Sequence, residues 1–211
     1  FIPEDTPEIM KKEGLVYGAQ VYLVKGLIND AGKIVRDNAG ARGWFDVSTL
    51  KEPYRAEGKK TMGLELAEHF DWELPDAILY PTGGGTGIVG MWKAFEELEA
   101  LGWIGSKRPK MISVQADGCA PIVNTIKERS DIVRPVKPNT IAKSLAIGNP
   151  ADGYYATKTV LDSGGWADSA SDEEIIEAMK LLAQTEGIFT ETAGGVTVAV
   201  APDPIKPVIP V

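Results

Sequence analysis

The chain has 211 residues, of which 44% are hydrophobic and 25% are charged, so it can form a packed globular core. Its net charge of -8 and scattered lysines and arginines argue against a nucleic-acid partner, because phosphate binding needs clustered basic residues. A single cysteine, Cys119, leaves no internal disulfide, and no apolar run reaches the roughly 20 residues of a membrane helix. The lone cysteine fits a reducing compartment, so we expect a cytoplasmic protein with no membrane partner. One histidine and one cysteine cannot build a zinc site, so we expect no metal.

The N-terminal quarter predicts short helices and strands. Phe1–Pro7 looks like the end of a buried strand running into a helix cap, so we expect polypeptide to be missing upstream. Asp5 or Thr6 can cap a helix over Pro7–Gly14, with Pro7 in its first turn. The other elements predicted here are a strand over Ala19–Val24, loop with partial helix over 27–40, and a strand over Trp44–Val47.

From about residue 53 onward, helices and strands alternate. Helices are predicted over 57–70, Ile88–Leu101, Pro121–Ser130, part of Gly153–Ser163, a stretch opened by the Ser171–Glu174 capping box, and Ala193–Val200. Strands are predicted over Ala77–Tyr80, Lys110–Ala116 and Ile188–Thr190, and a further strand is predicted to start within Gly153–Ser163. Such alternation indicates an α/β fold of three layers, a mostly parallel sheet with helices on both faces.

A glycine-rich loop, Pro81–Gly87, lies between a predicted strand and a predicted helix. Glycines let the backbone approach a ligand, and the helix N-terminus favours an anion such as phosphate. The loop does not fit the dinucleotide or the Walker A spacing. A tight turn without a ligand is the alternative, although four glycines in five positions are more than a turn needs.

The loop resembles the phosphate cradle of the fold-type II pyridoxal-phosphate enzymes, the group of threonine synthase, threonine dehydratase and tryptophan synthase β. Four further segments resemble the threonine synthase branch, in the family's order: Phe1–Pro7, Tyr54–Thr61, Asn139–Pro150 and Gly187–Val196. The resemblance implies a fold truncated at the N-terminus. Residues 1–52 would be a remnant of the smaller N-terminal domain, and 53–211 the cofactor phosphate-binding domain.

The resemblance also implies an activity and a site. O-Phosphohomoserine and water would give threonine and phosphate, with pyridoxal 5'-phosphate as electron sink, in a homodimer acting on a small phosphorylated amino acid. The cofactor-binding residues would be Thr82, Gly83, Gly84, Gly85, Thr86 and Gly87 at the phosphate and Glu191 and Thr192 near the ring. The substrate residues would be Arg55, Ser144 and Asn149.

The sequence departs from the family at the catalytic lysine. The family's Ser-Phe-Lys-like motif, upstream of the segment matched by Phe1–Asp5, is not in this sequence, and neither is its Thr-Gly-Asn-Gly-Leu-Lys-like segment near the other end. Lys59, Lys93 and Lys143 stand in other contexts, so no catalytic residue is assigned and the chain alone is expected to be inactive. Three alternatives stay open: a related enzyme such as threonine dehydratase or cysteate synthase, a non-catalytic anion-binding module, and an engineered fragment.

Overall fold

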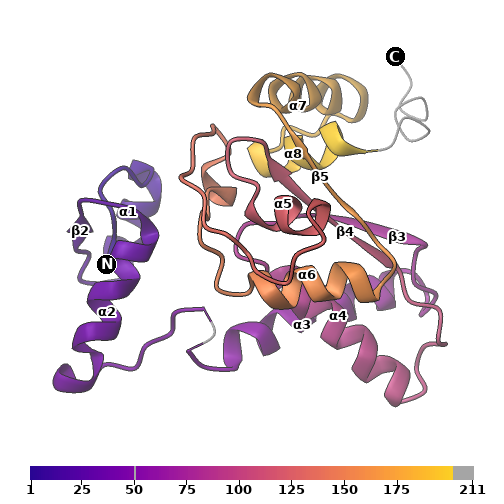
Figure 1. The fold of residues 1–211 in the computed structure, drawn as a ribbon, viewed down its shortest axis with the longest axis horizontal. Coiled ribbons are helices and arrows are strands. Elements are labelled where there is room, and N and C mark those ends of the chain that lie inside the picture. The colour runs from indigo at the N-terminus through magenta and orange to yellow at the C-terminus, as the bar shows by residue number, and fades with distance from the viewer. Residues whose placement is uncertain (50, 202–211) are drawn as a thin grey trace. The chain divides into compact units, whose positions relative to one another are not determined.

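The protein is described from a computed structural model, which covers residues 1–49 and 51–201. The chain divides into two compact units, Phe1–Glu52 and Pro53–Val211, which we call the N-terminal unit and the C-terminal unit (Figure 1). Within residues 1–49 and 51–201, none of the helices is both long and apolar enough to cross a bilayer.

The N-terminal unit contains two strands of two residues each and two helices. Its elements are β1 (Ile2–Pro3), α1 (Glu8–Val16), β2 (Leu23–Val24) and α2 (Ile28–Arg42). β1 and β2 pair in parallel, with Ile2 opposite Leu23. The helix predicted from Pro7 is confirmed as α1, whereas the strand predicted over Ala19–Val24 is only two residues long.

Two further predictions for this unit were wrong. Residues 27–40 are not loop with partial helix, since 28–40 belong to the 15-residue helix α2. The Asp30 carboxylate accepts a hydrogen bond from the Leu27 N–H at 2.7 Å at its start, and Gly43 closes the other end with φ 65°. These end contacts stabilise the helix against its internal glycines. Trp44–Val47 is not a strand, and it pairs with no strand in the described part of the chain.

The N-terminal unit has a small core. Ala31 is the only fully buried hydrophobic residue among its described residues, and α1 has none. Large apolar side chains on α1 and after it remain exposed, namely Ile9, Leu15, Val16, Tyr17, Tyr22 and Leu23. A unit of this size with so little buried apolar surface is not stabilised by its own core alone.

The C-terminal unit contains the parallel sheet. Its elements are α3 (Tyr54–His69), β3 (Ala77–Pro81), α4 (Thr86–Ala100), β4 (Lys110–Ala116), α5 (Pro121–Lys127), the 3-10 helix η1 (Lys143–Leu145), α6 (Gly153–Asp162), β5 (Ala167–Ala170), α7 (Asp172–Glu186) and α8 (Thr192–Val200). The strand order is β3-β4-β5, with Ala77 opposite Lys110 and Ser113 opposite Ala167, and both pairings are parallel. The predicted α/β class with a parallel sheet is confirmed.

Helices cover both faces of this sheet (Figure 1). On one face, Ile78 and Met111 pack against Phe95 of α4 and Val160 of α6. On the other, alternate strand residues such as Leu79 pack with α7 and α8. The alternation of the two cores along β3 and β4 follows from the two-residue period of a strand.

One strand of this unit was predicted in the wrong place. Ile188–Thr190 forms no strand, and Phe189 is 87% exposed. The third strand is β5, whose sequence Ala-Asp-Ser-Ala has no β-branched or aromatic residue. Its strand conformation comes from pairing with β4, a tertiary effect that overrides local propensity.

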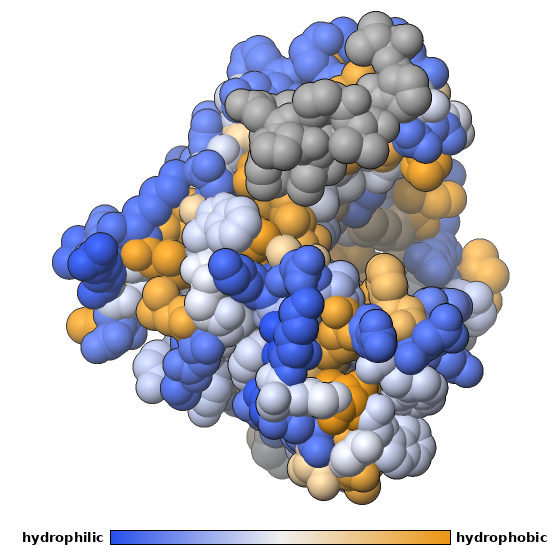
Figure 2. All heavy atoms as spheres, turned by 90° about the vertical axis from the view of Figure 1, so that its right-hand side faces the viewer, coloured by the Kyte–Doolittle hydropathy of each residue, from blue (hydrophilic) through white to orange (hydrophobic). Residues whose placement is uncertain are grey.

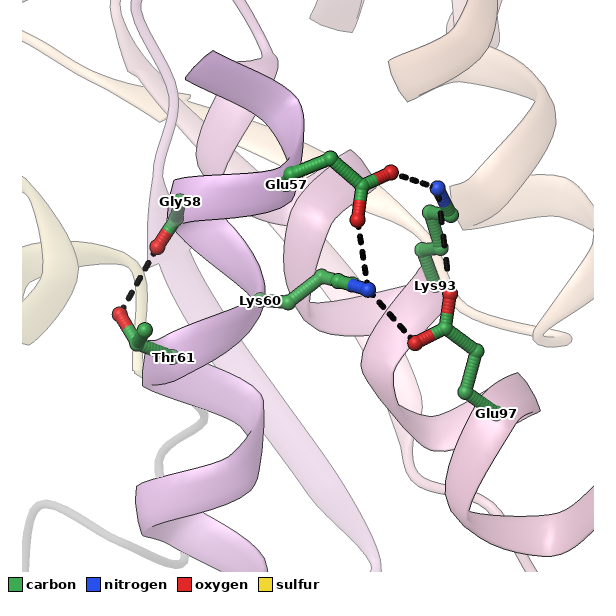
Figure 3. A network of polar contacts seen from close by, with 6 residues as sticks. All are labelled: Glu57, Gly58, Lys60, Thr61, Lys93 and Glu97. Carbon is green, nitrogen blue, oxygen red and sulfur yellow. Dashed lines mark hydrogen bonds and ion pairs between the residues drawn. The ribbon is translucent and has the colours of Figure 1, made fainter. Parts of the chain in front are cut away.

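Four charged side chains join α3 to α4 (Figure 3). The Lys60 Nζ lies 2.6 Å from a carboxylate oxygen of Glu57 and 2.7 Å from one of Glu97. The Lys93 ammonium contacts the carboxylates of the same two residues. Hydrogen bonds from Lys60 and then Lys93 hold the pKa of Glu57 below its usual range. The Thr61 hydroxyl, also drawn in Figure 3, donates within α3 to the Gly58 carbonyl at 2.8 Å.

Replacing Lys60 with methionine is expected to lower stability at low salt, and the loss should shrink as salt screens the remaining charges. The ionised Glu57 stabilises the fold above its unfolded pKa, and this contribution is lost as pH falls through its lowered folded pKa. Urea unfolding at two salt concentrations measures the effect. Lys158→Met, which removes a pair with Asp162 inside one helix, is the control. Equal, salt-independent losses in both variants would contradict a role for the network.

On the face drawn in Figure 2, hydrophobic residues lie in small groups between hydrophilic ones. Exposed apolar side chains of the C-terminal unit include Leu101, Trp103, Tyr154 and Tyr155. Exposed residues of this kind are available for contacts with other molecules.

Candidate functional site

The glycine loop begins where β3 ends against β4. The Thr82 N–H donates to the Val114 carbonyl at 2.8 Å, which extends the strand pairing by one residue. The Thr82 hydroxyl donates to the Tyr80 carbonyl at 2.8 Å, and the residue is fully buried. Both donors of Thr82, which is predicted at the cofactor phosphate, are therefore engaged inside the protein.

The next backbone amides have no acceptor. Among the hydrogen bonds of the described residues, none uses the N–H of Gly83, Gly84 or Gly85, and the first amide of α4 that bonds back is Val89, to the Gly85 carbonyl at 3.2 Å. The N–H groups of the first helical turn have no partner inside any α-helix. A run of donors therefore stands at the positive end of a 15-residue helix, which is an environment that favours an anion.

The glycines of the loop differ in what surrounds them. A Cβ added at Gly84 would meet no atom within 4 Å, so open space lies beside this residue. At Gly83 a Cβ would lie 3.3 Å from the Ser144 carbonyl oxygen and 3.3 Å from Ile147 Cγ1. The segment around η1 therefore forms one wall of the loop.

A second wall comes from the start of α6. Gly85 has φ 105°, which side chains rarely adopt, and its Cβ would lie 2.8 Å from Ala156 Cβ and 3.2 Å from Asp152 Cβ. At Gly87, a Cβ would lie 2.0 Å from the Tyr80 hydroxyl oxygen. These two glycines are needed by the fold itself, whereas Gly84 leaves space that a ligand can enter.

Two site residues from distant parts of the sequence meet beside the loop. The Ser144 hydroxyl lies 3.2 and 3.1 Å from the two carboxylate oxygens of Glu191, and donates to them. Glu191 precedes α8, whose first residue is Thr192, and Ser144 belongs to the wall that contacts Gly83. Asn149 is exposed in the segment between η1 and α6, and no hydrogen bond of the described residues involves its side chain.

Arg55 lies on the α6 side of the loop. It is an exposed residue in the first turn of α3, and its positive charge acts on the carboxyl of Asp152, the residue that packs against Gly85. The structure thus brings Arg55, Gly85 and Asp152 into one region.

Asp152 was not predicted as a site residue. Its side chain is 1% exposed, and neither carboxyl oxygen accepts a well-formed hydrogen bond. Burial raises the pKa of Asp152, and the nearby Thr86 hydroxyl and the Arg55 charge only partly oppose this. Burial of Asp152 depends on elements distant in sequence, so no local pattern predicts it.

Gln115 was also missed. Its side chain is fully buried on β4, and its amide nitrogen donates to the Thr82 carbonyl at 2.9 Å. Its amide oxygen accepts from the N–H groups of Ile122 and Val123, each at 3.0 Å. One side chain therefore links the start of the glycine loop to the first turn of α5, and a polar residue inside an apolar strand was the available signal.

Cys119 does not provide a reactive thiol. It is 1% exposed, and burial raises its pKa to about 11. Within the part of the chain that the structure describes, no three His, Cys, Asp or Glu side chains are grouped to hold a metal ion. The loop and its walls remain the chemically distinctive region.

Sequence comparison finds threonine synthases among the curated relatives of the chain. The chain is 39% identical over 201 residues to the threonine synthase of Methanocaldococcus jannaschii, covering 94% of this chain and 49% of that protein. It is 38% identical over 188 residues to the threonine synthase of Methanosarcina acetivorans, covering 89% and 46%. The chain spans about half the length of the curated relatives it matches.

Solved structures share the fold. A fungal L-serine ammonia-lyase from Rhizomucor miehei matches with a TM-score of 0.78 at 20% identity, covering 99% of this chain and 63% of that one. Maize serine racemase matches with a TM-score of 0.75 at 22% identity, covering 97% and 59%. A family model described as pyridoxal-phosphate dependent enzyme matches residues 1–206. The chain therefore belongs to the pyridoxal-phosphate dependent enzyme family, and within it is similar to threonine synthases.

Proposed function

We propose that this chain is part of a threonine synthase-like lyase that converts O-phosphohomoserine and water to threonine and phosphate. The family assignment and the threonine synthases that are 38% and 39% identical support this activity. The observation that carries the proposal is the set of amide groups without acceptors at Gly83, Gly84 and Gly85, beside the space at Gly84.

The residues present fit the phosphate of pyridoxal 5'-phosphate. The amides of Gly83, Gly84 and Gly85, together with those of Thr86 and Gly87 at the start of α4, would hold a dianion. The Thr86 hydroxyl adds a donor to the anion. Thr82 instead fixes the start of the loop, through its hydrogen bonds to the Val114 and Tyr80 carbonyls. When bound, the cofactor supplies an electron sink for bonds broken at the substrate's carbon atoms.

The other candidate residues have roles that follow from their place. The Arg55 guanidinium would bind the substrate phosphate, since its planar fork matches phosphate oxygens. Ser144 holds the Glu191 carboxylate beside the loop, and with Thr192 this pair would face the cofactor ring. Asn149 would contact the substrate from the segment after η1.

In this proposal the two units have different roles. Residues 1–52 are a remnant of the smaller domain, which is consistent with their small core, and 53–211 are the cofactor phosphate-binding domain, of which 202–211 lie outside the described residues. The amine that bonds the cofactor is not assigned to any lysine of this sequence, so the chain alone should bind without turnover. We place the protein in the cytoplasm, as a homodimer, because its one thiol is unpaired and apolar side chains remain exposed.

Gly84→Val tests the phosphate cradle. The new side chain would enter open space without strain, so folding should be unchanged while phosphate affinity falls by about 100-fold, or about 2.7 kcal/mol. Calorimetric titration with 4'-deoxypyridoxine 5'-phosphate, which has no aldehyde to react with lysines, measures the affinity. Gly105→Val, at another glycine with nothing within 4 Å, is the matched control.

The activity itself is tested separately, by phosphate release from O-phosphohomoserine and from O-phosphoserine and by ammonia release from threonine. We expect no turnover by the chain alone. Unchanged ligand affinity in Gly84→Val would refute the cradle, and tighter binding of O-phosphoserine than of O-phosphohomoserine would refute the substrate.

A further inference from the structure

The carboxyl group of Asp152 stands at the wall of the glycine loop. The residue precedes α6, and its Cβ lies 3.2 Å from the position that a Cβ on Gly85 would take. Its side chain is 1% exposed, and both carboxyl oxygens lack a well-formed hydrogen bond. A buried carboxylate in this state is costly, so the arrangement needs an explanation.

The groups around Asp152 do not offset the effect of burial on its pKa. From α4 the Thr86 hydroxyl faces it, and from α3 the Arg55 charge acts on it, yet burial prevails and its pKa is raised. α5 and β4 also pack against α6, but their exposed Lys127 and Lys110 contribute nothing to the pKa of Asp152. The environment therefore makes protonation of this carboxyl easier than that of an exposed aspartate.

A protonated carboxyl can donate a hydrogen bond to a bound anion. It carries one O–H donor, whereas the ionised form carries only acceptors. An anion held by the amides of the loop would be repelled by a carboxylate at this wall but would accept a short, strong hydrogen bond from the acid.

We propose that Asp152 is a positioning residue for the bound phosphate and that the glycine loop takes up one proton, held on Asp152, together with the anion. This rests on the proposed function, because it assumes that the loop binds phosphate. The consequence is that anion affinity decreases as pH rises, by about tenfold per pH unit while binding is coupled to the uptake of one proton.

Sulfate is the probe for the test, since it remains a dianion throughout and its own titration does not interfere. Its affinity for the 211-residue chain is measured by calorimetry between about pH 5 and about pH 9. We expect a falling affinity in the unaltered chain and a flat profile in Asp152→Asn, whose amide keeps a donor and cannot ionise. Asp162→Asn, at the other end of α6, should retain the fall.

A second measurement does not depend on a variant that folds. At a pH where Asp152 of the free chain is ionised, titrations of the unaltered chain in two buffers of different ionisation enthalpy give the number of protons taken up, which should approach one. Binding of sulfate with equal pH dependence in Asp152→Asn, or with no proton uptake, overturns the role of Asp152 while leaving the site intact. Absence of sulfate and phosphate binding in both proteins overturns the site and this inference together.

Discussion

Gly85→Ala is expected to lower the free energy of unfolding by about 3 kcal/mol. Two independent costs contribute. The backbone at Gly85 has φ 105°, and holding a residue with a side chain in such a conformation costs about 1–3 kcal/mol. The added methyl would also lie 2.8 Å from Ala156 Cβ, and forcing extra volume into a packed wall costs about 1–3 kcal/mol.

The neighbouring glycine provides the control. Gly84→Ala adds the same methyl where nothing lies within 4 Å and where no positive φ is required. It should raise stability by about 0.5 kcal/mol, because alanine restricts the unfolded chain. Urea unfolding of both variants measures the difference, and equal effects would show that the fold does not need a glycine at 85. A large loss in both would instead mean that Gly84 is also required by the fold.

The elements that the sequence predicted well carry their signal locally. Lys110–Ala116 was predicted as a strand and is β4, and the Ser171–Glu174 capping box does open α7, with the Glu174 N–H bonded to the Ser171 hydroxyl at 3.2 Å. The run of apolar residues marks β4 within its own seven residues, and the contacts that open α7 lie three residues apart. β5 and the segment Ile188–Thr190 show the opposite, since pairing with β4 decides which of the two becomes a strand.

The candidate site divides in the same way. The glycine loop was evident because strand, glycines and helix follow one another in sequence, and its free amides follow from that order. Ser144 and Glu191 were placed at the site by resemblance, and the structure brings them within hydrogen-bond distance across 47 residues. Asp152 and Gln115 were missed because burial of a polar side chain depends on elements that are distant in sequence.

Gln115→Leu is expected to destabilise the protein by about 4 kcal/mol and to weaken phosphate binding at the loop. The substitution keeps the volume but leaves the Thr82 carbonyl and the N–H groups of Ile122 and Val123 buried without their partner. Each such group costs about 1–3 kcal/mol. Gln184→Leu, at an exposed position of α7, should stay within about 0.5 kcal/mol of the unaltered chain.

Gln115→Glu separates the hydrogen bond to Thr82 from the bulk of the side chain. Protonated glutamic acid can donate to the Thr82 carbonyl and accept from Ile122 and Val123, as the glutamine does, whereas the ionised form cannot donate. Burial raises the pKa of a glutamate at this position above its unfolded value, so the native state binds the extra proton. The stability of the variant should therefore approach that of the unaltered chain at low pH. It should fall as pH rises from the unfolded pKa of the glutamate through its raised folded pKa. Urea unfolding and sulfate titration across the same pH range follow the two effects. A variant whose stability and affinity, relative to the unaltered chain, do not change with pH would show that the donor to Thr82 does not hold the loop.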